Sequence, residues 1–304
     1  MTTLNKKPNP FTFTIDWEDF GQLYYKYFFG DTLAPSPKTI DRQTNIILDL
    51  LNETNVKATF FVLGILAKHR PDLVRKIVDE GHEIALHGMN HDAMFKLTTK
   101  QAKADILYSK KLISDISGTE LLGYRAPFFS IIEKNLYILE YLAELGFQYD
   151  SSIFPIKMSR YGIENFSHEN KKYKLPNGGE IVELPLTTFK YANKHWPISG
   201  GGYIRAMPSL LLRSIFNSIK TKDTMIYMHP YEFDNEKLDI ASNFSPTQRN
   251  QYKYKIKTQN FRWNLFQPTV VKKIKFILQH NSFSTCIEKS NYVKNNSLSS
   301  TILE

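Results

Sequence analysis

Two groups of residues in this chain have the chemistry of a metal site. In the run TIDWED, Asp16, Glu18 and Asp19 follow directly on the alternating segment FTFTI. Further along, His87 and His91 are four residues apart, a spacing that predicts both imidazoles on one side of a helical turn. Two imidazoles and a carboxylate suit a catalytic zinc site, which keeps another position open for water or substrate. The spacing therefore indicates a divalent-metal site whose third ligand comes from the acidic run.

Each group also has a purely structural explanation. Histidine pairs at this spacing occur by chance, and acidic residues beside the start of a helix often cap it. His82 precedes the same strand-like segment as His87 and is expected to make structural hydrogen bonds, whereas Gly88 allows a tight backbone turn. The metal-site hypothesis therefore depends on whether further reactive residues join the two groups.

Other reactive side chains stand where strand-like segments end. Asp16, His87, Arg125, Asp150 and His229 each lie at or just after the end of such a segment. In a β/α barrel the carboxyl ends of the strands meet at one mouth, and this mouth carries the active site. We therefore expect the five side chains to converge, although they are far apart in the sequence.

The elements that must position these residues alternate along the chain. Strand-like runs are predicted at 11–16, 58–64, 82–87, 121–127, 180–186 and 224–230, and the short segment 147–152 holds Asp150. Amphipathic helical patterns separate them, and apolar strands alternating with helices indicate parallel strands joined by crossovers. The prediction is an α/β fold with a closed or nearly closed β/α barrel, and an open doubly wound sheet is the alternative. We expect one domain over 1–304, with a motif core at 11–235 and an extension at 236–304 that holds a packing helix near 267–281.

Two further segments are predicted to lack regular structure. Residues 241–260 are polar without clear periodicity, which indicates a loop. The last residues, from 294 to 304, are expected to fray. Several aromatic residues are candidates for a sugar-stacking platform, although aromatic side chains are more often part of a core. These are Trp17, Phe128, Phe129, Trp196 and Tyr203.

Composition and charge exclude several classes of protein. The chain has 304 residues, of which 42% are hydrophobic and 23% charged, so long disorder is excluded. The net charge of +9 is compatible with nucleic acid, an anionic membrane or a phosphate-bearing substrate. No compact basic and aromatic motif supports nucleic-acid binding, so no nucleic-acid partner is predicted.

Cysteine content and hydropathy bear on the cellular compartment. Cys286 is the single cysteine, so an intramolecular disulfide and a cysteine-based zinc knuckle are excluded. No run approaches the roughly 18 apolar residues of a spanning helix, and the segment before the first strand has no apolar leader. We therefore expect a cytoplasmic protein without a transmembrane segment.

Six short motifs in register give the chain a resemblance to a known family. They are TIDWEDF, ATFFVLG, GHEIALHGMNH, GYRAPFFSI, YDSSIFP and IYMHPYEFD. In this order they resemble the polysaccharide deacetylase family, which is carbohydrate esterase family 4 with the NodB-homology domain. More narrowly, the chain resembles the branch with an Asp-x-Glu-Asp first motif, found in bacterial exopolysaccharide and surface-glycan gene clusters. The resemblance implies a deformed β/α barrel that holds a divalent metal, usually zinc, with cobalt or nickel as alternatives.

The resemblance also implies roles for the first two motifs. The two histidines described above fall on metal ligands, and Asp16 falls on the general base. In the commoner form of the first motif the third ligand directly follows the base, but here that position is Trp17, which cannot coordinate a metal. Because strand side chains alternate, Glu18 points the same way as Asp16 and is favoured as the third ligand. Asp19 stays open as the alternative.

The later motifs supply the remaining roles. By the resemblance, Arg125 orients the base, the backbone N–H of Phe128 helps to hold the oxyanion, and His229 is the general acid. Asp150 in YDSS is matched with the family's fourth motif and is assigned to the substrate or oxyanion region. Arg205, in the glycine-rich loop SGGGYIRAMP, is a further candidate for contact with the substrate.

These roles together describe hydrolysis of an N-acyl group. The reaction needs a base for the water, a charged group for the oxyanion and an acid for the departing amine. The sequence therefore predicts a metal-dependent hydrolase that removes an acetyl group from an amino sugar of a bacterial glycan. A cytoplasmic precursor linked to a lipid or a nucleotide is the favoured substrate, and a lipid-linked one implies peripheral membrane association. Two alternatives stay open: an amidohydrolase of small cyclic amides or ureides, and a catalytically inactive glycan-binding homologue.

Overall fold

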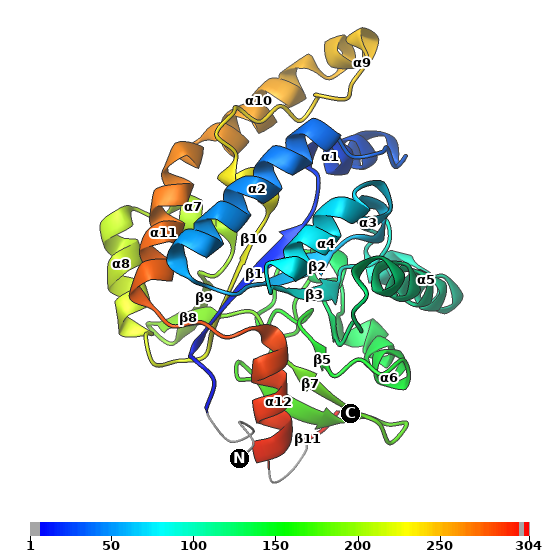
Figure 1. The fold of residues 1–304 in the computed structure, drawn as a ribbon, viewed down its shortest axis with the longest axis vertical. Coiled ribbons are helices and arrows are strands. Elements are labelled where there is room, and N and C mark those ends of the chain that lie inside the picture. The colour runs from blue at the N-terminus through cyan, green and yellow to red at the C-terminus, as the bar shows by residue number, and fades with distance from the viewer. Residues whose placement is uncertain (1–6, 298–300, 304) are drawn as a thin grey trace.

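A central sheet organises the molecule. The computed structural model describes residues 7–297 and 301–303, and within these residues nine strands form one mostly parallel sheet (Figure 1). In spatial order they are β10 (Thr224–Met228), β1 (Phe11–Trp17), β2 (Thr59–Val62), β3 (Glu83–Leu86), β4 (Gly123–Tyr124), β5 (Tyr149–Asp150), β7 (Glu180–Glu183), β6 (Lys171–Lys174) and β11 (Thr301–Ile302). All neighbours pair in parallel except β6 and β7, which are antiparallel.

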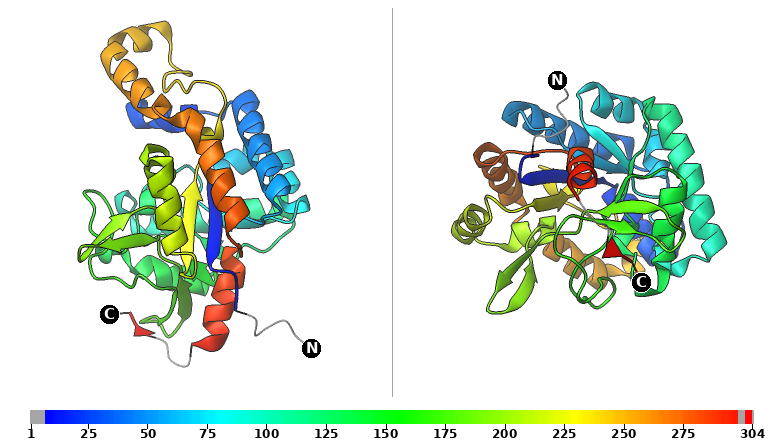
Figure 2. Two further views of the ribbon diagram at one scale, coloured as in Figure 1. Left: turned by 90° about the vertical axis from the view of Figure 1, so that its left-hand side faces the viewer. Right: turned by 90° about the horizontal axis from the view of Figure 1, so that it is seen from below.

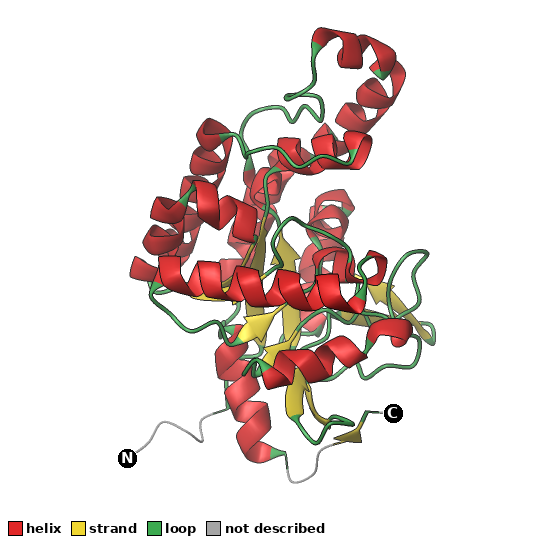
Figure 3. Ribbon diagram, turned by 90° about the vertical axis from the view of Figure 1, so that its right-hand side faces the viewer, coloured by secondary structure: helices red, strands yellow, loops and turns green. Residues whose placement is uncertain are grey.

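Helices surround this sheet, as the colouring by secondary structure makes clear (Figure 3). Around the strands lie α2 (Pro37–Thr54), α3 (Gly64–His69), α4 (Pro71–Asp79), α5 (Thr99–Ser117), α6 (Tyr137–Glu144), α7 (Gly201–Ala206), α8 (Ser209–Ser218), α11 (Val270–His280) and α12 (Cys286–Asn296). Above the carboxyl ends of the strands lie α1 (Phe20–Phe29), α9 (Pro246–Gln251) and α10 (Lys253–Asn264) (Figure 2). Within the described residues, no helix combines the length and apolarity that crossing a membrane requires.

Strand β1 shows why the sheet is buried on both sides. All seven of its residues are buried, and it lies between β10 and β2, with Ile15 beside Met228 and Asp16 beside Phe61. A parallel strand that is buried on both faces is built mostly from apolar and β-branched residues. The polar Asp16 near its end is therefore an exception that needs partners.

The sheet curves into a deformed barrel that is closed by an irregular segment. From β1 to β5 the spatial order follows the chain order without the reversal of a doubly wound sheet, and β10 lies on the other side of β1. After β7 the chain makes the hairpin of β8 (Thr188–Tyr191) and β9 (Lys194–Pro197) and then runs beside β10. There the N–H of Tyr227 donates to the carbonyl of Ser199 at 2.9 Å, and the Ser199 hydroxyl donates to the carbonyl of Thr187 at 3.0 Å. The predicted deformed β/α barrel is therefore confirmed.

The lobe above the barrel corrects the prediction of a loop at 241–260. Most of this segment forms α9 and α10, and α1 is a further helix that the sequence analysis did not predict. The apolar residues Ile256 and Trp263 of α10 pack into a cluster with Phe20 at the start of α1. The apolar face of α10 is short and its partner is distant in sequence, which is why periodicity alone does not reveal the helix.

The end of the chain also differs from the prediction. Instead of fraying from residue 294, α12 continues to Asn296, and β11 adds to the sheet edge by pairing Thr301 with Tyr173. Residues 298–300 and 304 of the predicted frayed end lie outside the described residues. The packing helix expected near 267–281 is present as α11. The single-domain organisation stays a prediction.

Candidate metal centre and active site

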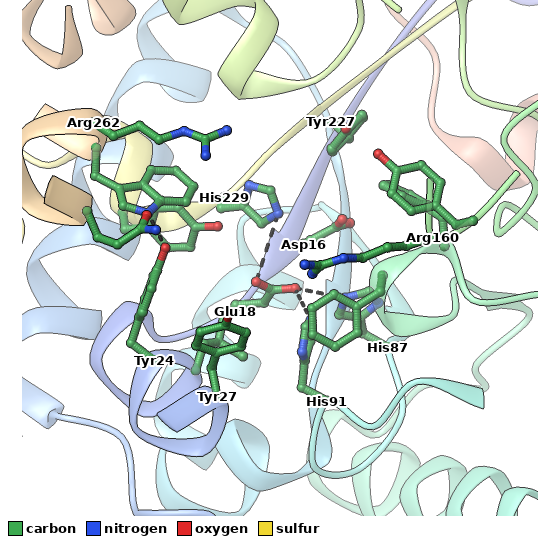
Figure 4. A pocket seen from close by; sticks show the side chains of 17 residues that line it. Asp16, Glu18, Tyr24, Tyr27, His87, His91, Arg160, Tyr227, His229 and Arg262 are labelled. Carbon is green, nitrogen blue, oxygen red and sulfur yellow. Dashed lines mark hydrogen bonds and ion pairs between the residues drawn. The ribbon is translucent and has the colours of Figure 1, made fainter. Parts of the chain in front are cut away.

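A cleft of about 410 Å³ opens where β1, β3 and β10 end, below α1 and α10 (Figure 4). Its lining includes Asp16, Glu18, Tyr24, Tyr27, His87, His91, Phe128, Arg160, Tyr227, His229, Arg262 and Trp263. Acids and imidazoles form its floor, whereas aromatic residues and two arginines form its walls. The expected convergence at the strand ends therefore holds for Asp16, His87 and His229.

Glu18 and the two histidines form one compact group on this floor. The Glu18 Oε1 atom lies 3.0 Å from Nε2 of His87 and 2.8 Å from Nε2 of His91. All three side chains are buried. Burial raises the pKa of Glu18, but the nearby His91 and His229 and the hydrogen bonds of its carboxylate to His87 and His91 lower it well below the ordinary value. The Glu18 carboxylate therefore stays ionised.

The backbone fixes the orientation of His87. Its Nδ1 atom lies 2.7 Å from the carbonyl oxygen of Arg125, to which it donates. With Nδ1 held by the backbone carbonyl, Nε2 is the ring nitrogen that faces the cleft and Glu18, and it is the one that would coordinate a metal.

The path from His87 to His91 is not the helical turn that the spacing suggested. These residues form an irregular loop in which Gly88 has φ of 78° and His91 has φ of 58°. The loop is held because the N–H of Gly64 donates to the carbonyl of Gly88 at 2.9 Å. Two left-handed residues therefore bring the imidazoles together, with ring centroids 5.5 Å apart.

Asp19 has a different function from its neighbour Glu18. It is the N-cap of α1, where its carboxylate accepts a hydrogen bond from the N–H of Gln22 at 2.7 Å. Burial raises the pKa of Asp19 to about 6, although backbone hydrogen bonds oppose this shift. In the part of the chain that the structure describes, the groups able to hold a metal contain Glu18 but not Asp19.

A buried ion pair supports the floor of the cleft. Nη1 of Arg125 lies 2.6 Å from Oδ1 of Asp16 and 2.8 Å from the Thr14 hydroxyl. On its other side, Nη2 of Arg125 donates to the Ser151 hydroxyl, and the guanidinium lies 3.9 Å from the centroid of the Phe61 ring. Arg125 is fully buried and does not line the cleft, so it acts on Asp16 rather than on a bound molecule.

His229 closes the opposite side of the floor. Its Nε2 atom is 3.9 Å from Oε2 of Glu18, and its Nδ1 atom is 3.2 Å from Oε2 of Glu232. The ring stacks on Tyr231, with centroids 4.9 Å apart and planes within 10°. Burial lowers the pKa of His229, but the negative charges of Glu18, Glu232 and Asp16 outweigh this and raise it to about 9. Glu232 was not among the predicted site residues, although a carboxylate three residues after a histidine was a usable signal.

Phe128 lies at the rim of the cleft in a strained conformation. Its φ of 58° and ψ of 18° are unusual for a residue with a side chain. The ring, 53% exposed, packs edge-on against His91 with centroids 4.3 Å apart. No acceptor for the Phe128 N–H is found among residues 7–297 and 301–303. This N–H is therefore available to a bound molecule.

Asp150 does not reach the cleft, which corrects its assignment to the substrate region. It is fully buried at the end of β5, and its carboxylate accepts from the N–H and the hydroxyl of Ser152 at 2.9 and 2.6 Å. Its register partner on β7 is Glu183, which is equally buried. Two acids side by side on adjacent strands leave this carboxylate facing protein rather than solvent.

The prediction that Arg205 contacts the substrate is also corrected by the structure. Instead of lining the cleft, it lies behind Trp263, with its guanidinium 4.7 Å from the centroid of the indole and Nη1 3.1 Å from the Trp263 carbonyl. It therefore supports the wall of the cleft from outside.

The predicted aromatic platform is present only in part. Phe128 and Phe129 line the cleft, whereas Trp17 is buried in the core. Trp196 and Tyr203 do not line it. The aromatic wall is instead made by residues of α1 and α10, two helices that the local sequence pattern does not predict. These are Tyr24, Tyr27 and Trp263.

The floor of the cleft fits a divalent cation. Glu18, His87 and His91 offer one carboxylate oxygen and two imidazole nitrogens that all lie within 4.8 Å of one another. Nε2 of His87 is already directed toward Glu18, because Nδ1 is hydrogen-bonded to the backbone. Two histidines and a carboxylate with further space in the cleft are the donor set of catalytic zinc sites. The residues present therefore suit a metal in both chemistry and orientation.

Two family models match adjacent parts of the chain. Residues 35–149 match the model described as Polysaccharide deacetylase. Residues 151–289 match one described as a domain of unknown function, DUF3473. The first match contains His87, His91 and Arg125, and the second contains His229.

Curated relatives match over shorter stretches. Over 157 residues the chain is 31% identical to a peptidoglycan deacetylase of Helicobacter pylori, covering 47% of this chain and 52% of that protein. Over 90 residues it is 34% identical to a peptidoglycan-N-acetylglucosamine deacetylase of Bacillus cereus, covering 30% and 33%. Over 101 residues it is 32% identical to chitin deacetylase 1 of Cryptococcus neoformans, covering 33% and 20%. The chain thus spans about half or less of the length of these relatives.

Two solved structures share the fold over nearly the whole chain. A Mycobacterium smegmatis protein described as a polysaccharide deacetylase superposes with a TM-score of 0.60 at 19% identity, covering 98% of this chain and 95% of that one. Puue allantoinase superposes with a TM-score of 0.58 at 13% identity, covering 97% and 96%. At these identities the similarity shows a common fold and nothing more.

Proposed function

The chain belongs to the polysaccharide deacetylase family. On this premise we propose that it is a metal-dependent hydrolase that removes an acetyl group from the nitrogen of an amino sugar. The observation that carries the proposal is the meeting of Glu18, His87 and His91 with Asp16 and His229 at one cleft. The relatives named above are deacetylases of peptidoglycan or chitin, which are both polymers of N-acetylated sugars.

In this proposal Glu18, His87 and His91 hold the metal, with zinc first and cobalt or nickel next. Such a cation, when bound, polarises the acyl carbonyl and lowers the pKa of water. Glu18, which the sequence favoured, is the third ligand rather than the alternative Asp19, because the Asp19 carboxylate caps α1.

The chain's own residues perform the proton transfers. Asp16 accepts the proton of the attacking water, and Arg125 holds its carboxylate in place through the 2.6 Å contact. His229 lies across the cleft floor and donates a proton to the nitrogen of the departing amine. Glu232, which contacts the other ring nitrogen, orients this imidazole. The free N–H of Phe128 donates to the oxyanion at the rim.

The carrier of the sugar is proposed to be a lipid, with a nucleotide as the alternative. The outer side of α10 leaves Tyr254 86% and Phe261 70% exposed. Between residues 240 and 287 the sequence has eight lysines and arginines and no aspartate or glutamate. Exposed aromatic residues with a surplus of positive charge favour contact with an anionic bilayer. A cytoplasmic location stays a prediction.

Two other functions are less well supported. Hydrolysis of a cyclic amide or ureide agrees with the fold that the chain shares with Puue allantoinase, but fold alone does not determine the substrate. A catalytically inactive glycan-binding protein is disfavoured because the ligand set, the base and the acid are all present together.

The test is a mass-spectrometric screen with zinc-loaded full-length protein. N-acetylglucosamine oligomers, a nucleotide-linked and a lipid-linked N-acetyl sugar, and allantoin are offered as substrates, with Asp16→Asn as the inactive control. Loss of acetyl from an amino sugar, absent in the control, is expected. Hydrolysis of allantoin alone would favour the ureide alternative and contradict the proposal.

A further inference from the structure

Two arginines face the cleft from opposite sides. Arg160 lies in the loop after β5 and Arg262 on α10, and both reach toward the space above the catalytic floor (Figure 4). The arginines with a carboxylate partner in the described part of the chain are Arg42, Arg70, Arg125 and Arg249. Arg160 and Arg262 are not among them, so their charges are available to a ligand.

The loop that carries Arg160 is anchored. The N–H of Met158 donates to the carbonyl of Tyr161 at 3.0 Å, which closes a tight turn around Arg160. The Tyr161 ring packs against Phe129 and Phe154, with centroids 5.9 and 5.7 Å away. The backbone at Arg160 is thus fixed against the wall of the cleft.

Arg262 is anchored through its neighbour Trp263. The Trp263 indole N–H donates to the hydroxyl of Tyr24 on α1, and Arg205 stacks on its other face. The positive charge of Arg262 lies close enough to lower the pKa of Tyr24, against a larger rise caused by burial. Three elements therefore hold this part of the wall before any ligand arrives.

We propose that Arg160 and Arg262 form a clamp for a phosphate group that the substrate carries next to its N-acetyl sugar. This inference rests on the proposed function for the identity of the sugar. A guanidinium is always charged and binds phosphate oxygens through two parallel N–H groups. Helix α10 carries Lys253, Lys255, Lys257 and Arg262 and no aspartate or glutamate, which adds a positive field on this side of the cleft. Nucleotide-linked and lipid-linked sugars share this phosphate chemistry, whereas a neutral glycan polymer lacks it.

The clamp is tested by calorimetry on zinc-loaded full-length protein carrying Asp16→Asn, so that no turnover occurs. The probes are N-acetylglucosamine, its 1-phosphate, and its diphosphate esters with uridine and with a short isoprenoid. We expect every phosphate-bearing probe to bind at least about tenfold more tightly than the neutral sugar, because hydrogen bonds between charged groups are strong. The tighter of the two diphosphate esters identifies the carrier.

Substitution of the two arginines distinguishes phosphate binding by the clamp from phosphate binding by the metal. Arg160→Gln and Arg262→Gln should each weaken the 1-phosphate by about tenfold and leave the affinity for the neutral sugar unchanged. The matched control is Arg213→Gln, because this arginine stacks on Phe276 away from the cleft. Unchanged affinity in both cleft variants would mean that the metal alone binds the phosphate, and would overturn the clamp. Equal affinity of phosphorylated and neutral probes, or no binding of either, would also overturn it.

Failure of the clamp can be distinguished from failure of the proposed deacetylase function. Acetyl loss from a neutral oligomer without any preference for phosphate would leave the deacetylase proposal standing and remove the clamp. The opposite result is that binding of the 1-phosphate depends on the arginines, but the unsubstituted enzyme releases acetyl from no substrate. This result would support the clamp and contradict the deacetylase proposal.

Discussion

Two pairs of charged residues on adjoining parts of one sheet differ in what surrounds them. At the cleft, Asp16 on β1 meets Arg125, which follows β4, and Glu18 continues the chain into the open floor. Deeper in the sheet, Asp150 on β5 and Glu183 on β7 are register partners and both acids. We call these the cleft pair, Asp16 and Arg125, and the sheet pair, Asp150 and Glu183.

The electrostatic consequences are opposite. In the cleft pair the acid faces a buried cation, whose positive charge compensates its negative charge. In the sheet pair, burial and the negative charge of Asp150 raise the pKa of Glu183 well above its ordinary value. One proton therefore stays within the sheet pair. A buried acid at a strand end is thus not by itself a catalytic residue, because its partners and its access to the cleft decide what it can do.

The largest expected difference between the two pairs is in turnover. Asp16→Asn should lower the rate of acetate release by about 10²- to 10⁴-fold, because a general base is lost. Asp150→Asn should keep the wild-type rate, since its carboxylate contacts Ser152 rather than the cleft. Initial rates with one N-acetyl sugar measure both variants. Equal losses of rate in the two variants would contradict the different roles given to Asp16 and Asp150.

Stability should reveal how the cleft pair is held together. Arg125→Leu leaves Asp16 as a buried charge without its partner and should lower the free energy of unfolding by about 3–5 kcal/mol. Adding Asp16→Asn to that variant should restore part of the loss, because the uncompensated charge is removed. Urea denaturation of the two single variants and the double variant measures this coupling. Strictly additive effects would show that the pair is not coupled.

A smaller effect should appear in the pH dependence of the sheet pair. Glu183 keeps a proton in the folded state that the unfolded chain releases, so it stabilises the fold at low pH and loses this contribution as the pH rises above about 4.5. Its contribution to the slope is at most about 1.4 kcal/mol per pH unit. Glu183→Gln should make the decline in stability with rising pH less steep.

Denaturation at several pH values measures that slope. The exposed Glu53→Gln serves as the matched control and should follow the wild type. Parallel curves for wild type and Glu183→Gln would mean that the sheet pair does not share a proton.

Much of the barrel and of its catalytic floor could be predicted from the sequence. The strand-like runs that end in Asp16 and His87 are apolar and β-branched, and parallel topology brings their ends together. Local patterns suffice where an element is buried by its immediate neighbours. The position of the acids in TIDWED followed from strand alternation up to Glu18, after which Asp19 begins a helix.

The wall of the cleft could not be predicted in the same way. Helix α10 depends on contacts with α1, which lies more than two hundred residues earlier, and its Lys253, Lys255 and Lys257 conceal the helical period. The surroundings of Asp150 could not be predicted for the same reason, because only the register between β5 and β7 places an acid beside it. Contacts between segments that are far apart in the sequence determine the positions of these residues, and no local sequence pattern encodes such contacts.

The central claim is that Glu18, His87 and His91 hold a divalent metal. It is tested most directly by the zinc content of dialysed protein, measured by mass spectrometry for wild type, Glu18→Gln and Asp19→Asn. The wild type and Asp19→Asn should retain about one zinc ion per chain, with Asp19→Asn losing only about 1 kcal/mol of stability with its cap. Glu18→Gln should lose the metal. Retention of zinc by Glu18→Gln together with its loss from Asp19→Asn would contradict the account.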